Sequence, residues 1–85
     1  MAKAIIMPKL GLSMQTGTIT AWHVKEGDYV HIGDILFSLE TDKIIHDTES
    51  TAEGFVLQIV AKEGEEVLVT SPCCYVGEQG EVVHM

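Results

Sequence analysis

The residues best placed for chemistry in this 85-residue chain form one short run, Glu40-Thr41-Asp42-Lys43, between two apolar segments. Asp at such a position predicts a tight turn, because its carboxylate can accept hydrogen bonds from nearby backbone amides. Lys43 would then project from a hairpin tip as an exposed primary amine on a fixed backbone. That geometry suits enzymatic modification. The alternative interpretation is an ordinary solvated lysine in a turn.

Other reactive side chains do not predict a metal or hydrolytic site. The four histidines lack ligand spacing, and the two cysteines lack the C-x-x-C gap of a zinc knuckle. No spacing argument brings Ser38 or Ser71 to His46 as a nucleophile and base. Neighbouring strand residues point to opposite faces, so we expect no disulfide between Cys73 and Cys74. Their thiols should pack as small hydrophobic groups.

Short strands must position the lysine, because eight Gly and two Pro separate apolar, β-branched runs and no convincing helix is found. Within residues 35–41, one face of the strand should hold Ile35, Phe37, Leu39 and Thr41, and the other face Leu36, Ser38 and Glu40. We predict strands near residues 2–7, 18–24, 35–41, 44–50, 55–61 and 73–77, with shorter pairings near Tyr29 and Val67.

An internal repeat relates two parts of the chain at an offset of 37 residues. Residues 17–30 read GTITAWHVKEGDYV, and residues 54–67 read GFVLQIVAKEGEEV. The glycines of the two KEG turns, Gly27 and Gly64, supply the permissive backbone that a tight turn needs. Two copies are too few for a solenoid, so the repeat predicts two similar halves folded together with approximate twofold symmetry.

Composition limits the classes of partner. Five Lys and thirteen Asp or Glu give a net charge of −8, and only one Lys against eight acids lies in residues 44–85. Such a surface repels phosphate backbones and anionic lipid, which argues against nucleic acid and membrane binding and favours basic partner sites. The length fits one domain, and no apolar run reaches the length of a membrane span. A soluble protein in a reduced, intracellular compartment is expected.

Over about residues 4–81 the chain resembles the lipoyl domains of 2-oxoacid dehydrogenase acyltransferase components. The matching strings are MPKLGLSM at 7–14, the repeat at 17–30, GDILFSLETDK at 33–43, the second repeat from Gly54 and VGEQGE at 76–81. This resemblance implies an all-β flattened barrel-sandwich of two four-stranded antiparallel sheets with quasi-twofold symmetry. Lys43 would lie at a hairpin tip of one sheet, with both termini close together in the other.

The resemblance also implies a non-catalytic carrier whose Lys43 is amide-linked to lipoate by a lipoate ligase or lipoyl transferase. Glu40, Asp42 and Gly33 would contribute to presentation of the lysine. The lipoyl group would accept an acyl group from a thiamin-diphosphate-dependent decarboxylase and deliver it to coenzyme A at the acyltransferase catalytic domain. Dihydrolipoamide dehydrogenase would then reoxidise the lipoyl group.

Within this family, MPKLGLSM is similar to the pyruvate and acetoin dehydrogenase type. In that type the loop at 9–16 lies beside the lysine turn and helps the decarboxylase to choose its carrier. This loop comprises Lys9, Leu10, Gly11, Leu12, Ser13, Met14, Gln15 and Thr16, with Leu12 and Met14 as the expected apolar contacts. The chain departs from the family at Ile44-Ile45-His46, where a small residue usually follows the lysine, and at Cys73-Cys74.

Two alternatives carry different functions. Biotinyl carrier domains resemble one another in having Met on both sides of the lysine, whereas Asp42 and Ile44 flank it here. An unmodified barrel-sandwich interaction module would need flanking helical hairpins that these residues do not encode. We therefore expect a monomeric lipoyl domain over 1–85, the first domain of a larger acyltransferase. Its location would be the cytoplasm, or the mitochondrial matrix in a eukaryote.

Overall fold

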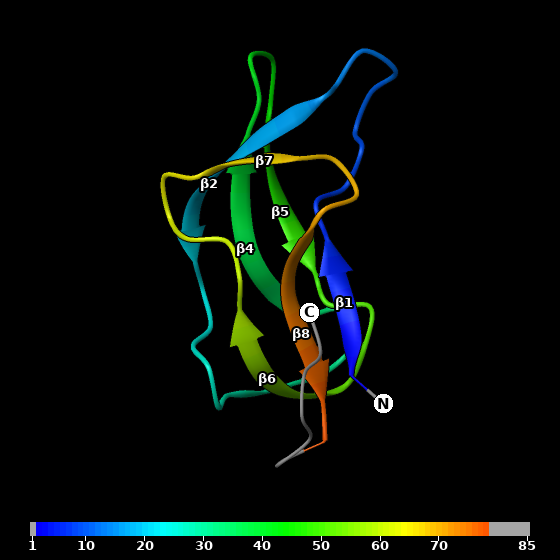
Figure 1. Ribbon diagram of the computed structural model, residues 1–85, viewed down its shortest axis with the longest axis vertical. Coiled ribbons are helices and arrows are strands. Elements are labelled where there is room, and N and C mark those ends of the chain that lie inside the picture. The colour runs from blue at the N-terminus through cyan, green and yellow to red at the C-terminus, as the bar shows by residue number, and fades with distance from the viewer. Residues whose placement is uncertain (1, 79–85) are drawn as a thin grey trace.

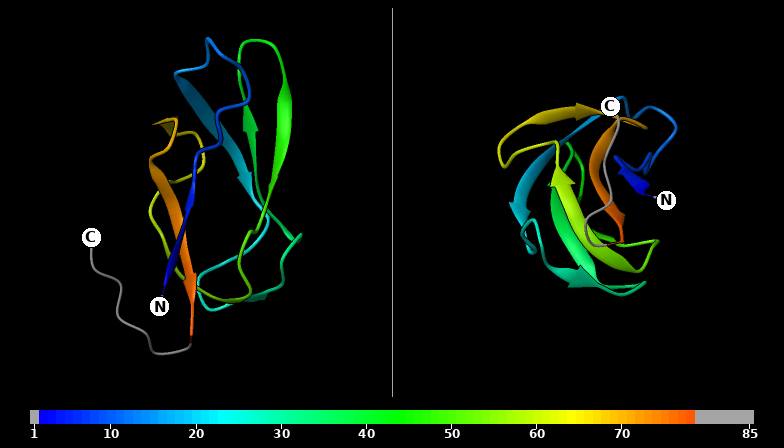
Figure 2. Two further views of the ribbon diagram at one scale, coloured as in Figure 1. Left: turned by 90° about the vertical axis from the view of Figure 1, so that its right-hand side faces the viewer. Right: turned by 60° about the horizontal axis from the view of Figure 1, so that its bottom comes forward.

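The computed structural model describes residues 2–78, which form eight strands and no helix (Figure 1). Two four-stranded antiparallel sheets, in the orders β1-β8-β6-β3 and β5-β4-β2-β7, pack face to face (Figure 2). The predicted fold class is confirmed. No helix in this part of the chain is long and apolar enough to cross a membrane. The strands are β1 (Lys3–Ile6), β2 (Thr16–Trp22), β3 (Tyr29–Val30), β4 (Ile35–Glu40), β5 (Ile45–Glu49), β6 (Gly54–Ile59), β7 (Glu66–Leu68) and β8 (Pro72–Gly77).

The two sheets are related by the quasi-twofold symmetry that the repeat predicts. Strands β1, β2, β3 and β4 each occupy, in one sheet, the position that β5, β6, β7 and β8 respectively occupy in the other sheet. Each short strand pairs with a strand of the other half of the chain. Strand β3 of the first half pairs with β6 of the second half, and β7 of the second half pairs with β2 of the first half. The β4–β5 hairpin therefore corresponds to the pairing of β8 with β1, the last and first described strands.

The glycines of the two KEG turns are bound to the opposite half by equivalent hydrogen bonds. The amide of Gly27 donates to the carbonyl of Val56 at 2.7 Å, and the amide of Gly64 donates to that of Ile19 at 2.6 Å. Their φ angles of 95° and 84° lie in the left-handed region that favours glycine. The recurrence of glycine in the repeat thus follows from backbone geometry.

The glutamates of the KEG turns have an equally specific role. The Glu26 carboxylate accepts a hydrogen bond from the amide of Ile59 at 2.8 Å. In the other half the Glu63 carboxylate accepts one from the amide of Trp22 at 2.9 Å. Each acid thereby satisfies a backbone donor at the end of a strand in the other half, which accounts for its recurrence at the same repeat position.

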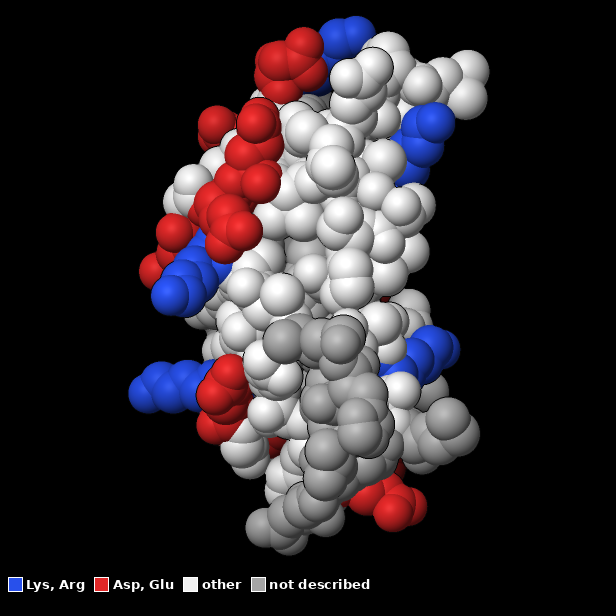
Figure 3. Space-filling view, in the orientation of Figure 1, with Lys and Arg blue, Asp and Glu red and all other residues white. Residues whose placement is uncertain are grey.

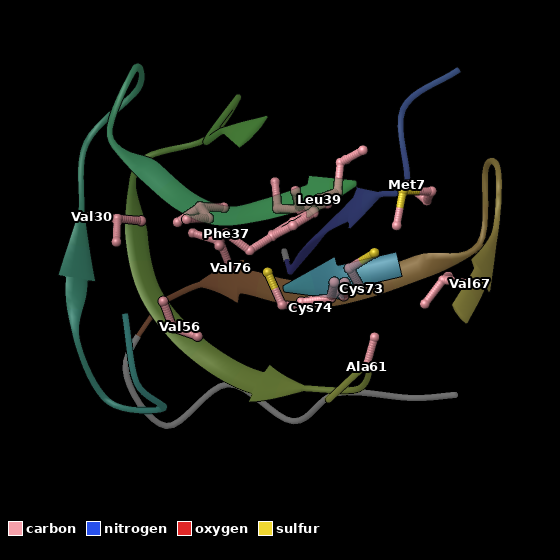
Figure 4. Close-up of a cluster of buried hydrophobic side chains, with 13 residues drawn as sticks. Met7, Val30, Phe37, Leu39, Val56, Ala61, Val67, Cys73, Cys74 and Val76 are labelled. Atoms are coloured by element: carbon pink, nitrogen blue, oxygen red, sulfur yellow. The ribbon is translucent and has the colours of Figure 1, made fainter. Parts of the chain in front are cut away.

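The hydrophobic core lies between the sheets, and side chains from both sheets point into it (Figure 4). Trp22 packs at the edge of this core, with its ring centre 4.8 Å from that of Phe37. Its indole nitrogen donates a hydrogen bond to the carbonyl of Ala61 at 2.8 Å. Full burial of each large apolar side chain contributes about 1.5–3 kcal/mol. The core comprises Ile5, Met7, Ile19, Val30, Leu36, Phe37, Leu39, Val56, Ala61, Val67, Cys73, Cys74 and Val76.

The prediction that buried and exposed residues alternate strictly along β4 is wrong at Leu36. This residue and its neighbour Phe37 are both fully buried. The ladder between β4 and β5 shifts register between Ile35 and Phe37. This irregularity adds one residue to β4 and turns Leu36 into the core.

The expectation that Cys73 and Cys74 face opposite ways is wrong for the same reason. The pairing of β1 with β8 shifts register at this point, so that consecutive residues Ile5 and Ile6 pair with Cys74 and Pro72. Both cysteines are free and fully buried, as the prediction of thiols packed as small hydrophobic groups requires. Burial raises the pKa of the Cys73 thiol to about 11 and that of Cys74 to about 12.

Candidate functional site

The tip of the β4–β5 hairpin presents Lys43 at one pole of the molecule (Figure 1, top). The last pair of the ladder joins Glu40 to Ile45, and the four intervening residues form the turn. Lys43 is exposed, and within residues 2–78 its side-chain amine has no hydrogen bond or ion pair. The amine is therefore open to reaction while the strands on either side are fixed.

Thr41, a residue that the sequence analysis did not single out, ties this turn. Its amide donates to the carbonyl of Ile44 at 2.8 Å, and its hydroxyl oxygen accepts from the amides of Lys43 and Ile44 at 3.3 and 3.2 Å. Asp42 makes no hydrogen bond within the described chain, so the prediction that its carboxylate holds the turn is wrong. Threonine also forms such turns, a signal that was present in the sequence.

A groove of about 600 Å³ separates the hairpin tip from the loop that joins β1 to β2. The two segments lie side by side at the same pole in Figure 1 and in the left view of Figure 2. Lys9 and Leu12 do not line the groove, and the Leu12 side chain is 98% exposed. The lining consists of Leu10, Gly11, Ser13, Met14, Gln15 and Thr16 from the loop, Gly17, Thr18 and Glu66, and residues 40–44 of the hairpin.

The loop wall of the groove is fixed by its own contacts. The sulfur of Met14 accepts a hydrogen bond from the amide of Leu10 at 3.2 Å, and the amide of Met14 donates to Gly11 at 3.1 Å. Farther along, the carbonyl of Gln15 accepts from the amide of Val69 at 3.0 Å. Leu10 and Met14 also pack against the core. The loop thus forms a defined surface beside the lysine.

Carboxylates outnumber cations in the groove. Among the described residues, the carboxylates of Glu40, Asp42 and Glu66 line it and Lys43 is the only cation that does so. Glu66 accepts a hydrogen bond from the hydroxyl of Thr16 at 3.2 Å. Figure 3 shows acidic side chains running from this pole down one flank of the molecule. The site therefore presents a negative field to any partner that approaches the lysine.

Gly33, the remaining predicted presentation residue, lies at the opposite end of β4 from the lysine. The six residues of that strand place it about 20 Å from the turn, so it cannot contact Lys43. Its φ of 96° favours glycine, and its amide donates to the carbonyl of Ser50 at 2.9 Å. Gly33 therefore does not assist presentation by contact with the lysine itself.

A second cluster of reactive groups lies on the outer face of β4. The hydroxyl of Ser38 donates to the carboxylate of Asp47 at 2.6 Å and lies 2.8 Å from Nε2 of His23. Asp47 thus binds the serine instead of orienting the histidine, which is not the order of a hydrolytic triad. Within residues 2–78 no three His, Cys, Asp or Glu side chains cluster as metal ligands do.

The chain is similar to known proteins over nearly its whole length. A family model described as "Biotin-requiring enzyme" matches residues 3–76. The chain is 39% identical over 83 residues to the dihydrolipoyllysine-residue acetyltransferase component of the acetoin cleaving system of Bacillus subtilis, covering 98% of this chain and 21% of that protein. It is 40% identical over 84 residues to the corresponding pyruvate dehydrogenase component of Zymomonas mobilis, covering 98% and 19%.

A solved structure shares both the fold and part of the sequence. It is the solution structure of the lipoyl domain of the 2-oxoglutarate dehydrogenase complex from Azotobacter vinelandii, with a TM-score of 0.69 and 30% sequence identity. The match covers 91% of this chain and 100% of that one. By contrast, the chain spans about a fifth of the length of the two curated relatives.

Proposed function

The chain belongs to the biotin- and lipoyl-attachment family as one of its lipoyl domains, and we propose that Lys43 is the residue that carries the lipoyl group. The observation that carries this proposal is the exposed amine at the hairpin tip, which has no partner within the described residues. Attachment forms an amide bond between the carboxyl carbon of lipoate, activated by ATP as an acyl adenylate, and the Lys43 nitrogen, which loses a proton as AMP leaves.

The residues around Lys43 fit such an attachment. The turn holds the backbone, the amine projects beyond it, and the groove leaves space beside the lysine for an enzyme or an attached chain. When attached, the lipoyl group supplies a disulfide that can be reduced and acylated. The protein contributes a tether that raises the local concentration of the carried group at each active site.

The proposed partners follow from this carrier role. They are a lipoate ligase or lipoyl transferase, a thiamin-diphosphate-dependent decarboxylase, an acyltransferase catalytic domain and dihydrolipoamide dehydrogenase. We propose that the groove and the 9–16 loop together form the surface that the decarboxylase reads, because they border the lysine. The chain would be a monomeric domain of a larger acyltransferase, located in the cytoplasm or, in a eukaryote, in the mitochondrial matrix.

Lipoate is favoured over biotin by three observations. The solved lipoyl domain matches over 91% of the chain, and the curated relatives are dihydrolipoyllysine-residue acetyltransferase components. The neighbours of the lysine, Asp42 and Ile44, also differ from the methionines that flank a biotinyl lysine.

Mass spectrometry of the modified protein tests the proposal. The purified domain is incubated with lipoate ligase, lipoate and ATP, and in parallel with biotin ligase, biotin and ATP. We expect one lipoyl increment, confined to the peptide that contains Lys43, and no biotin increment; the four other lysines serve as internal controls. A biotin increment would indicate a biotinyl carrier, and no increment from either ligase would favour an unmodified interaction module.

A further inference from the structure

We propose that Thr41 is a positioning residue, whose hydroxyl group holds the backbone of the turn so that Lys43 is presented to the modifying enzyme. This role rests on the proposed function of Lys43. It concerns a side chain that does not touch the reacting amine and acts only through the backbone that bears it.

The Thr41 hydroxyl uses its full hydrogen-bonding capacity within the turn. Its oxygen accepts from the amides of Lys43 at 3.3 Å and Ile44 at 3.2 Å, and its proton is directed to the carbonyl of Ile44 at 3.4 Å. The Thr41 amide binds that carbonyl as well, at 2.8 Å. Thr41 therefore binds the backbone amides on both sides of the Lys43 Cα and so fixes the direction in which the lysine leaves the hairpin.

No other described side chain holds this turn. Those of Glu40, Asp42 and Lys43 make no hydrogen bond within residues 2–78. Burial does not hold it either, because Ile44 is 45% exposed and Ile45 is 71% exposed. The conformation of the tip consequently depends on Thr41 and on the last pair of the β4–β5 ladder, Glu40 with Ile45.

Three other turns of the molecule use a different anchor. In each of them a carboxylate accepts a hydrogen bond from the backbone amide three residues earlier, and its charge is engaged within the turn. The pairs are Lys25 with Asp28 at 2.8 Å, His31 with Asp34 at 2.8 Å, and Lys62 with Glu65 at 3.0 Å.

The lysine turn is held by a neutral hydroxyl, and this has a consequence for recognition. The carboxylates of Glu40 and Asp42 are not engaged in holding the backbone and remain available to a partner that approaches Lys43. A carboxylate anchor would hold the same turn with its charge engaged in the turn. Thr41 thus separates the task of shaping the tip from that of presenting charge.

Removal of the hydroxyl at constant shape tests the role. Thr41→Val deletes the hydrogen bonds, and Thr41→Ser keeps the hydroxyl. Thr20→Val is the matched control, because Thr20 lies on β2 outside the groove and its hydroxyl donates to a backbone carbonyl of the same sheet, that of Ser38 at 3.3 Å. Amide hydrogen exchange is measured by NMR, together with the kinetics of lipoylation by lipoate ligase, lipoate and ATP.

In the wild type, the amides of Lys43 and Ile44 should exchange more slowly than that of Asp42, which donates no hydrogen bond within the turn. In Thr41→Val we expect faster exchange at both, with amides of β2 and β8 unchanged. The kcat/KM for lipoylation should fall by roughly two- to tenfold, as expected for loss of one net hydrogen bond, mainly through KM for the domain. Thr41→Ser should restore both quantities, and Thr20→Val should change neither.

Wild-type lipoylation kinetics in Thr41→Val, or a wild-type Lys43 amide that exchanges as fast as that of Asp42, would overturn the positioning role. Loss of lipoylation in Thr41→Ser equal to that in Thr41→Val would also contradict it. Failure of the wild-type domain to be lipoylated at Lys43 is a separate result, which contradicts the proposed function itself. The exchange measurement needs no variant and no ligase, so it decides the structural part even if Thr41→Val fails to fold.

Discussion

At the residue scale, the side chain of Lys43 is separable from the fold, because its amine has no partner among the described residues. Lys43→Gln should therefore change the free energy of unfolding by no more than about 0.5 kcal/mol, the usual range for exposed positions. Loading with lipoate should be abolished. Thermal unfolding and intact mass check both statements, and an unfolded variant would show that the lysine is structural.

Placement of the amine should matter as much as its presence. In the double variant Asp42→Lys with Lys43→Asp, an exposed lysine remains in the turn, but it is no longer the residue whose amide binds Thr41. We expect the ligase to leave the shifted lysine unmodified. Peptide mass after incubation with ligase, lipoate and ATP provides the measurement, and efficient loading at position 42 would refute a requirement for position.

The side-chain hydroxyl of Thr48 lowers the stability of the fold. Its Oγ1 is buried and has no hydrogen-bond partner among residues 2–78. Thr48→Val replaces this hydroxyl with a methyl group of similar shape and should stabilise the fold by about 1–3 kcal/mol. Ser50→Ala is the contrasting change, because the Ser50 hydroxyl binds the carbonyl and amide of Ala52 at 2.5 and 3.2 Å and its loss should destabilise. Denaturant unfolding compares the two, and destabilisation by Thr48→Val would contradict the prediction.

The two buried thiols give the fold a dependence on alkaline pH. Burial raises their pKa from 9.0 to about 11 for Cys73 and about 12 for Cys74. Between pH 9 and these values the unfolded chain loses thiol protons that the native state retains, so the free energy of unfolding should decrease as pH rises above about 9. Unfolding by denaturant at a series of pH values measures this. The double variant Cys73→Ala, Cys74→Ala should have a shallower dependence, and an unchanged slope would assign the effect to other groups.

At the element scale, quasi-equivalent turns before β4 and β8 differ in one residue. Gly33 and Thr70 occupy the same repeat position, with φ angles of 96° and 70°. A β-branched residue is strained there, whereas glycine is not. Thr70→Gly should stabilise the protein by about 0.5–1 kcal/mol, and Gly33→Thr should destabilise it by about 1–2 kcal/mol. Denaturant unfolding tests both, and a destabilising Thr70→Gly would show that side-chain contacts outweigh the strain.

The same pair separates backbone geometry from recognition. A Cβ at Gly33 would meet no atom within 4 Å, so the expected cost of Gly33→Thr comes from backbone conformation and not from a clash at Cβ. If Gly33 only shapes the chain, the folded variant should be lipoylated at the wild-type rate. A lower rate at full folding would support the predicted part of Gly33 in presentation.

The limits of sequence prediction also lie at the element scale. Alternation and the 37-residue repeat predicted the strands and the approximate twofold symmetry of the two halves, because burial of one face fixes both register and pairing. The exchange of the short strands β3 and β7 between the halves was not predicted. Leu36 and Cys73 were assigned to the wrong face of their strands, because a strictly alternating sequence pattern does not reveal where the strand pairing shifts register. Thr41 was missed because the side chains of Thr and Asp can both hold such a turn, and only the folded structure shows which of them does so.

At the scale of the whole molecule, twofold repetition builds a scaffold whose two poles differ. The carboxylates of Glu26 and Glu63 and the glycines of the KEG turns have equivalent partners in both halves. The hairpin tip with Lys43 has no such equivalent, since the corresponding place in the other sheet is the pairing of the first and last described strands. The proposed attachment site therefore lies at one pole, where the loop between β1 and β2 adds a second wall to the groove.

Selectivity for a partner should depend on that second wall. Replacement of residues 9–16 by the loop of a carrier from another complex should change which decarboxylase acylates the lipoylated domain, because the loop borders the lysine and is held rigid against the core. The rate of acylation by each decarboxylase is the measurement, with lipoyl loading confirmed by mass. Leu12→Ala and Met14→Ala divide the effect: Leu12 is 98% exposed and outside the groove, while Met14 lines it. A larger loss of acylation rate with Met14→Ala would place recognition in the groove, and a larger loss with Leu12→Ala would place it at the loop tip. Unchanged selectivity after the loop exchange would place recognition outside the loop.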